Sequence, residues 1–164
     1  MCIRDSSIEA LSAEGIEALG PEVEVRLAAA VPDFATVDGE RLLVPVTPFR
    51  DTFASEYAQL STRRSELVFR VPRTQSLTVR MPIPEGMRIL QMPDPVEAES
   101  SGLVYRFRVE EEDGAAVVHE EVTFPVQRVS AEDYPAFRAA CLAADAAQAG
   151  RIVFGPAAGE EEQP

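Results

Sequence analysis

The sequence predicts a mainly β protein: an antiparallel β-sandwich followed by one C-terminal α-helix and a short final strand. Two observations predict the strands. Apolar and polar residues alternate with period two over most of residues 22–127, and turn-forming Gly, Pro and Asp residues divide this region into short segments. A third observation is that the apolar spacing becomes helical after Ser130. We therefore expect alternate side chains from residue 22 to residue 127 to point into a shared apolar interior.

The N-terminal segments are the least regular. Residues 6–20 contain Ile8 and Leu11 at helical spacing, but Gly15 and Gly20 weaken a helix, so a loop with at most one helical turn is expected. A first strand is predicted over residues 22–31 and a second over residues 41–46, with Asp38-Gly39 as a turn between them. Residues 47–65 are predicted to be a long loop anchored by three aromatic residues, Phe49, Phe53 and Tyr57.

The later strands have clearer signals. Strands are predicted over residues 67–71, 77–81, 87–91 and 96–99, separated by proline- and glycine-containing turns. The best local pattern is a hairpin closed by Asp113-Gly114, in which Tyr105 and Phe107 share one face and Arg106 and Arg108 the other. Either arginine is expected to pair across the hairpin with Glu120 or Glu121.

The C-terminal part combines the helix with a last strand and a tail. A helix is predicted near residues 131–149, with Ser130 and Asp133 resembling a capping box and regular turns starting close to Tyr134. A short strand is predicted at residues 151–154. The short strands and frequent turns favour an immunoglobulin- or fibronectin-like sandwich over residues 21–154, and residues 155–164 are predicted to be a disordered acidic tail.

Composition excludes several classes of function. The formal net charge of -13 has the wrong sign for binding nucleic acid or anionic lipid through their phosphates. The sequence lacks an apolar run of about 20 residues, so no membrane span is predicted. Two cysteines and one histidine do not form a zinc pattern. We therefore predict no metal and no cofactor.

Residues 1–5, MCIRD, resemble a translated adapter from a sequencing library of the kind found in metagenomic reading frames. The alternative is a natural N-terminus that happens to match. With the adapter interpretation, residues 1–20 are an adapter remnant plus a linker from an upstream domain, and the natural gene continues upstream.

Several groups of residues are candidates for a functional site. Cys141 and His119 are the only pair that could form a Cys-His-acid centre, but Cys141 falls on the helix face that packs on the sheet, so a structural role is favoured. The acidic runs 110–113 and 160–162 could suggest a cation site, although a solvated hairpin turn and a solvated tail are favoured. The loop aromatics could form a sugar platform, but the chain has no Trp, and packing anchors are favoured. We predict no catalytic residues.

One resemblance extends over most of the chain, from about Ile8 to Phe154. It rests on the segments 82–86 and 92–95, the hairpin, and the segment 134–138, together with 31–35, Gly39, Leu42, Leu43 and the Arg63-Arg64 pair before Pro72. These resemble the C-terminal β-sandwich of bacterial proteins that carry an N-terminal domain of unknown function and a central transglutaminase-like domain. The resemblance implies a non-catalytic accessory domain, with any Cys-His-Asp triad in the upstream transglutaminase-like partner domain.

The resemblance also implies a periplasmic or extracellular protein. A stand-alone ligand-binding or adhesion sandwich is the alternative function. An enzyme in its own right is disfavoured, because no nucleophile, base and orienting group converge at a readable spacing.

Overall fold

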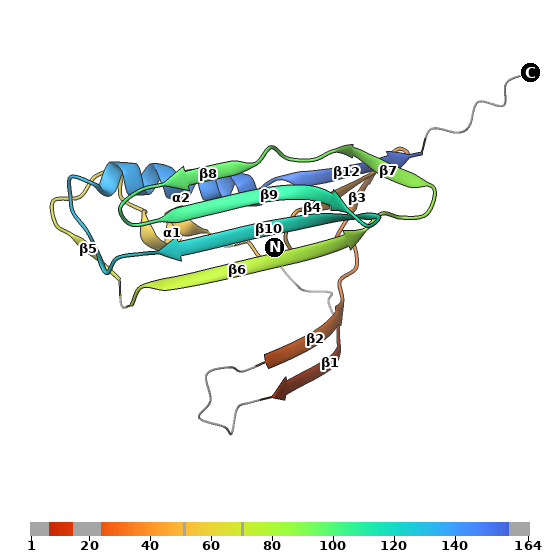
Figure 1. Cartoon of the computed structure of the whole chain (residues 1–164), viewed down its shortest axis with the longest axis horizontal. Coiled ribbons are helices and arrows are strands. Elements are labelled where there is room, and N and C mark those ends of the chain that lie inside the picture. The colour runs from red at the N-terminus through yellow and green to blue at the C-terminus, as the bar shows by residue number, and fades with distance from the viewer. Residues whose placement is uncertain (1–6, 15–23, 51, 70, 158–164) are drawn as a thin grey trace, which may run out of the picture. The chain divides into compact units, whose positions relative to one another are not determined.

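The computed structural model describes residues 7–14, 24–50, 52–69 and 71–157 (Figure 1). The chain forms two compact units, Met1–Phe34 and Ala35–Pro164. The predicted adapter at residues 1–5 and the acidic run 160–162 lie outside the described residues. No helix in the described ranges is both long enough and apolar enough to cross a membrane.

The first unit contains an antiparallel hairpin of β1 (Ser7–Glu14) and β2 (Glu24–Ala30), in which Leu11 is opposite Leu27 and Ala13 is opposite Val25. The prediction of a loop over residues 6–20 is therefore wrong for Ser7–Glu14, which form a strand. The first predicted strand is present as β2, but every described residue of β2 is exposed. The expectation that this strand points into the shared interior is also wrong.

In the second unit, one layer is a four-stranded antiparallel sheet in the order β6 (Arg73–Pro82), β10 (Ala115–Phe124), β9 (Val104–Glu112) and β8 (Val96–Glu99). The predicted turn joins β9 to β10, and both Asp113 (φ 45) and Gly114 (φ 70) have positive φ angles. A two-residue turn of this kind fixes the register so that Glu112 is opposite Ala115.

A second four-stranded sheet has the order β3 (Thr36–Asp38), β4 (Arg41–Pro45), β12 (Arg151–Pro156) and β7 (Met87–Gln91). A third, two-stranded sheet pairs β5 (Leu67–Val68) with β11 (Arg128–Val129). The strand predicted over residues 67–71 is thus shorter than expected. The predicted tail begins too early, because Gly155 and Pro156 belong to β12, whereas residues 158–164 lie outside the described part of the chain.

The long helix α2 (Tyr134–Gln148) begins where the sequence predicts. The Ser130 hydroxyl oxygen accepts a hydrogen bond from the backbone N–H of Asp133 at 3.0 Å. The N-cap of α2 is Asp133, which makes no side-chain capping bond, so Ser130 stabilises the turn before the helix and the predicted capping box is wrong. The predicted loop 47–65 contains a second helix, α1 (Phe53–Tyr57), so the prediction of a single helix is wrong.

The core of the second unit lies between the β6-β10-β9-β8 sheet and a layer formed by α2, α1 and the second sheet (Figure 1). Its largest fully buried side chains include Tyr105 from β9, Tyr134 and Phe137 from α2, and Phe154 from β12. The sequence prediction of an antiparallel β-sandwich with a C-terminal helix and a final strand is confirmed.

Candidate functional site

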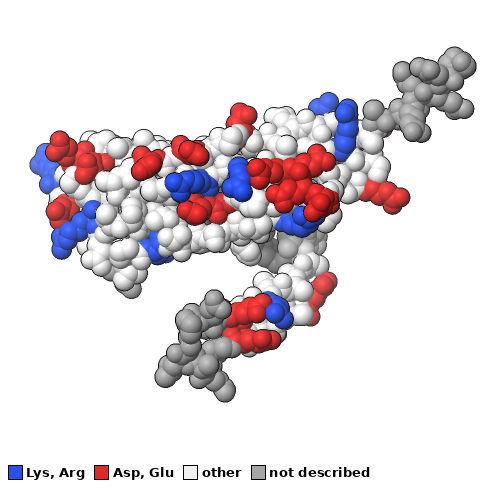
Figure 2. All heavy atoms as spheres, in the orientation of Figure 1, with Lys and Arg blue, Asp and Glu red and all other residues white. Residues whose placement is uncertain are grey.

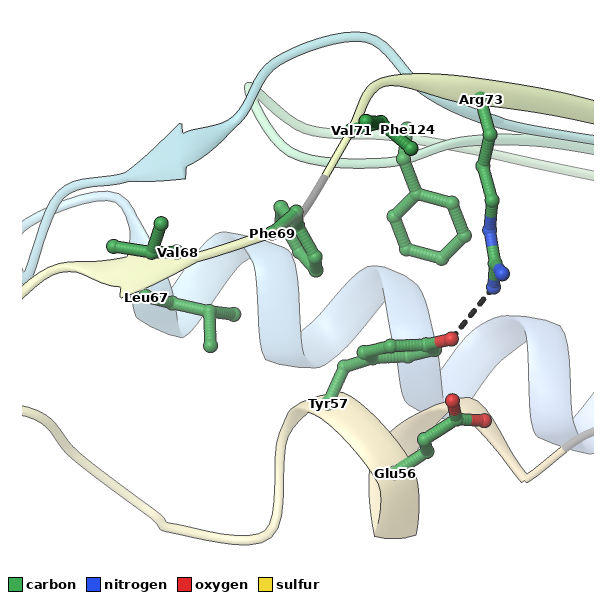
Figure 3. Close-up of a pocket in the computed structure, with 8 residues that line it drawn as sticks. All are labelled: Glu56, Tyr57, Leu67, Val68, Phe69, Val71, Arg73 and Phe124. Atoms are coloured by element: carbon green, nitrogen blue, oxygen red, sulfur yellow. Dashed lines mark hydrogen bonds between the residues drawn. The ribbon is translucent and has the colours of Figure 1, made fainter.

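Among the described residues, a pocket of about 480 Å³ lies where β6 begins and β10 ends. It is lined by residues from α1, β5, β6 and β10 and from the segment between β5 and β6, namely Glu56, Tyr57, Leu67, Val68, Phe69, Val71, Arg73 and Phe124 (Figure 3). Its walls are mostly apolar, with one cation and one carboxylate among them. Such a combination is typical of ligand sites, where a few polar groups fix the orientation of an apolar ligand.

Three aromatic rings form the inner wall. The ring centroids of Tyr57 and Phe124 lie 5.1 Å apart, those of Phe69 and Phe124 5.3 Å, and those of Tyr57 and Phe69 5.8 Å. All three contacts are tilted or edge-on, which is the arrangement that aromatic quadrupoles favour. The wall is therefore held by mutual contacts of rings that come from three separate segments of the chain.

Arg73 lies over this wall. Its guanidinium carbon is 5.0 Å from the centroid of Phe124 and 5.7 Å from that of Tyr57, and one terminal nitrogen donates a 2.6 Å hydrogen bond to the Tyr57 hydroxyl. Burial, and then a hydrogen bond to Glu56, raise the pKa of the Tyr57 phenol to about 12, so the phenol stays neutral at physiological pH. None of the described carboxylates lies within ion-pairing distance of Arg73.

The position of Tyr57 depends on α2. Both carboxylate oxygens of Asp145 accept hydrogen bonds from the first backbone N–H groups of α1, from Phe53 at 2.7 Å and from Ala54 at 3.1 Å. These N–H groups have no partner inside the helix, so the carboxylate acts as a cap supplied by a distant element. The cap fixes the short helix that carries Glu56 and Tyr57.

The three loop aromatics have different environments. Phe53 is buried and contacts Tyr105 and Phe124, so the prediction that it is a packing anchor is confirmed. Phe49 is 63% exposed and is not an anchor, which corrects that part of the prediction. Because Phe53 lies in the core, the three rings do not form an exposed sugar platform.

Cys141 and His119 lie on different sides of the β10 layer. Cys141 is fully buried in the core, where burial and then the charge of Asp145 raise the pKa of its thiol to about 12. His119 is on the outer face of β10, because Val118 and Val122, which are one and three positions away from it along the strand, face the core. The structure therefore does not bring these two residues together.

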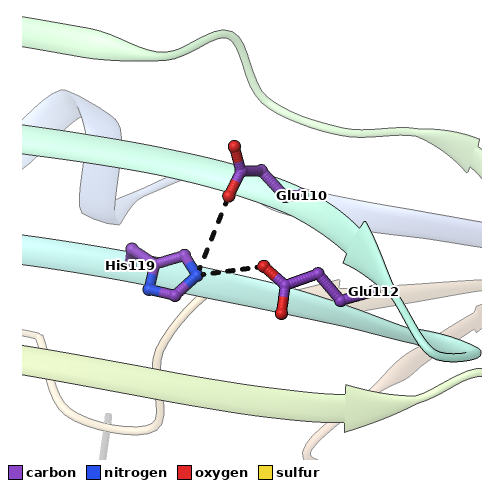
Figure 4. Close-up of side chains that lie close together, drawn as sticks. All are labelled: Glu110, Glu112 and His119. Carbon is purple, nitrogen blue, oxygen red and sulfur yellow. Dashed lines mark ion pairs between the residues drawn. The ribbon is translucent and has the colours of Figure 1, made fainter.

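His119 lies close to two residues of the acidic run 110–113, Glu110 and Glu112. Its Nε2 atom lies 3.5 Å from a Glu112 oxygen and 3.9 Å from a Glu110 oxygen, and the three potential ligand atoms lie within 4.8 Å of one another (Figure 4). The same Glu110 oxygen accepts a 3.0 Å hydrogen bond from Arg108, so this carboxylate already has a cationic partner. Figure 2 shows acidic side chains gathered near the β9–β10 turn, with basic side chains beside them.

Sequence reasoning missed the approach of His119 to Glu110 and Glu112. The signal was available in the two-residue turn, whose register places His119 opposite Arg108, diagonally adjacent to Glu110. The predicted arginine pairing is confirmed for Arg106, which contacts Glu121 at 3.3 Å. Glu120 faces the core instead, where it accepts a 2.6 Å hydrogen bond from Gln148 of α2.

Comparison with known proteins places this architecture in a family. The model of a domain of unknown function with solved structure, DUF3858, matches residues 40–154. A crystal structure of a "putative protease" from Parabacteroides distasonis aligns with a TM-score of 0.57 and 11% identity, covering 70% of this chain and 23% of that protein. No curated protein matches the chain. The chain belongs to the DUF3858 family.

Proposed function

We propose that this chain is a non-catalytic accessory domain of a longer protein, in which it packs on or positions a separate transglutaminase-like core. The observation that carries the proposal is that the aligned region makes up only 23% of the Parabacteroides distasonis protein. A similar fold is therefore one part of a larger chain there. That protein is called a "putative protease". Papain-like proteases and transglutaminase-like cores share Cys-His chemistry.

The geometry of this chain supports the non-catalytic part of the proposal. A cysteine nucleophile needs a base within hydrogen-bond reach and an accessible thiolate. Cys141 is buried with a raised pKa, and His119 lies on the outer face of the sheet. The resemblance to transglutaminase-associated sandwiches adds that the longer protein acts in the periplasm or outside the cell.

The alternative function is a stand-alone ligand-binding or adhesion module. The specific observation in its favour is the pocket of about 480 Å³ with its aromatic wall and Arg73. The two functions differ in what they require. An accessory domain needs a core elsewhere in the protein, whereas a stand-alone module needs only its ligand.

Activity assays on two proteins test the proposal. We expect the 164-residue chain to show neither casein hydrolysis nor incorporation of monodansylcadaverine into a glutamine-containing peptide. In a longer natural protein that carries a Cys-His-Asp core before this domain, deletion of the domain should lower kcat/KM without removing the core's reaction with a cysteine-directed probe. Turnover by the 164-residue chain that disappears in Cys141→Ala and His119→Ala variants would overturn the proposal.

A further inference from the structure

One edge of the main sheet is open beside the pocket. β6 is the terminal strand of the β6-β10-β9-β8 sheet and, among the described residues, pairs only with β10. In an antiparallel strand, backbone groups of alternate residues point to the two sides, so the outer side of β6 presents unpaired N–H and C=O groups. An extended peptide can satisfy such groups by pairing as an additional strand.

The register shows which side chains an added strand would meet. Arg73 is opposite Phe124 and Leu77 is opposite Glu120, so these two side chains of β6 share the core-facing side of the sheet with their partners. On that side Leu77, Val79 and Met81 are only partly buried, and Arg73 is exposed. The inner side of the edge is therefore apolar from Leu77 to Met81, polar at the exposed Gln75 and cationic at its first residue.

The pocket continues this pattern beyond Arg73. Val71, two residues before Arg73, lines the pocket and is 62% exposed. A side chain placed two residues along an added strand from the position opposite Arg73 would enter the pocket between Val71 and the aromatic wall, because alternate residues of a strand share one face. The edge and the pocket thus define a spacing of two positions in a bound peptide, between the residue opposite Arg73 and the residue in the pocket.

We propose that the β6 edge and its pocket bind an extended peptide segment in which a carboxylate and an apolar side chain are separated by one residue. The carboxylate pairs with Arg73, and the apolar side chain fills the pocket. Arg73 has no carboxylate partner among the described residues, and its guanidinium is already oriented by Tyr57 and Phe124. The proposal concerns peptide binding and does not depend on the accessory role.

Glu56 opposes this carboxylate. It lines the same pocket and lies close enough to hydrogen-bond the Tyr57 phenol. Its charge lowers the attraction of the pocket for an anion. The balance between Arg73 and Glu56 therefore gives two substitutions with opposite expected effects.

The probe is a fluorescein-labelled, threonine-rich peptide in which one glutamate and one phenylalanine are separated by a single threonine, made in both orders. Fluorescence anisotropy measures its binding to the full chain. We expect Arg73→Gln to weaken binding on the order of tenfold, because a charge-assisted hydrogen bond is lost. Glu56→Gln should strengthen binding severalfold. Arg88→Gln removes the same charge from β7, a strand of the second sheet that does not line the pocket, and should have little effect.

Changes in the peptide test the same contacts without altering the protein. Glutamine in place of glutamate should weaken binding to the original chain as much as Arg73→Gln does, and should cost little more in the Arg73→Gln variant. N-methylation of alternate peptide amides should abolish binding, because it removes the donors needed for strand pairing. Equal binding by Arg73→Gln and Arg88→Gln, unchanged binding of the N-methylated peptide, or no binding of either peptide order at millimolar concentration would overturn the proposal.

Discussion

The rate of alkylation of Cys141 measures how strongly the fold lowers the reactivity of this thiol, the only one in the described residues. The thiol has a pKa of about 12 in the folded chain, against 9.0 for an ordinary cysteine. At pH ~8 the thiolate fraction is then about one in ten thousand in the folded chain and about one in ten in the unfolded chain. Because the thiolate is the reacting species, alkylation through the native state should be about a thousandfold slower.

The assay uses a Cys2→Ser variant, so that Cys141 is the only thiol. Iodoacetamide is added at pH ~8 in native buffer and in concentrated guanidinium, and intact mass gives the two rates. A Cys2→Ser/Cys141→Ala double variant controls for reaction at other side chains. Native and unfolded rates within about tenfold of each other would refute the assignment of Cys141 to the core and weaken the argument that this domain lacks a nucleophile.

The same pKa shift predicts a dependence of stability on pH. Well below pH 9 the thiol is protonated in both states, so it adds no pH dependence there. Between 9.0 and about 12 the unfolded chain loses a proton that the folded chain keeps, so the free energy of unfolding falls as the pH rises. Urea unfolding at pH ~9 and ~10 should show this fall in Cys2→Ser and a smaller fall in the double variant; equal falls would contradict the shift.

Three further substitutions test the packing that holds the site, each by chemical denaturation. A Cβ at Gly102 would lie 2.3 Å from Val129 Cγ2, so Gly102→Ala should lower the free energy of unfolding by about 1–3 kcal/mol, and an unchanged midpoint would contradict this. Gln148→Ala leaves the buried Glu120 carboxylate without its hydrogen bond and should cost about 2–3 kcal/mol; adding Glu120→Gln should recover part of that loss. Asp145→Ala removes the cap of α1 and should cost about 1–2 kcal/mol, with faster amide exchange at residues 53 and 54; exchange as slow as in the original chain would argue against the cap.

The sequence predicts elements well where the signal is local. The β9–β10 hairpin combines alternating apolar and polar residues along most of β9 with an Asp-Gly turn, and α2 has a regular apolar stripe. β1 was missed because an irregularity in pairing between Ile8 and Ala10 interrupts the period-two pattern. Its apolar residues then occur at a spacing that resembles a helical turn.

The candidate site depends on contacts that the sequence does not signal locally. α1 has only five residues, and its cap comes from Asp145, 92 positions after Phe53 in the chain. An isolated helix of this length is unstable in water, so local propensity does not predict it. The pocket is lined by residues from α1 to β10, which span positions 56 to 124 of the chain. Arg73 and Phe124 become neighbours in it only when β6 pairs with β10.

The buried Glu120 shows how the register of the central strand is specified. Alternation along β10 requires Glu120 to share the core-facing side with Val118 and Val122. The cost of burying a carboxylate is offset because Gln148 of α2 donates to it at 2.6 Å. A slip of β10 by one residue would turn Glu121 inward and move both valines to the outer face. The Glu120–Gln148 bond and the apolar contacts of the valines therefore favour the same register, which is also the register that places Phe124 beneath Arg73 in the pocket.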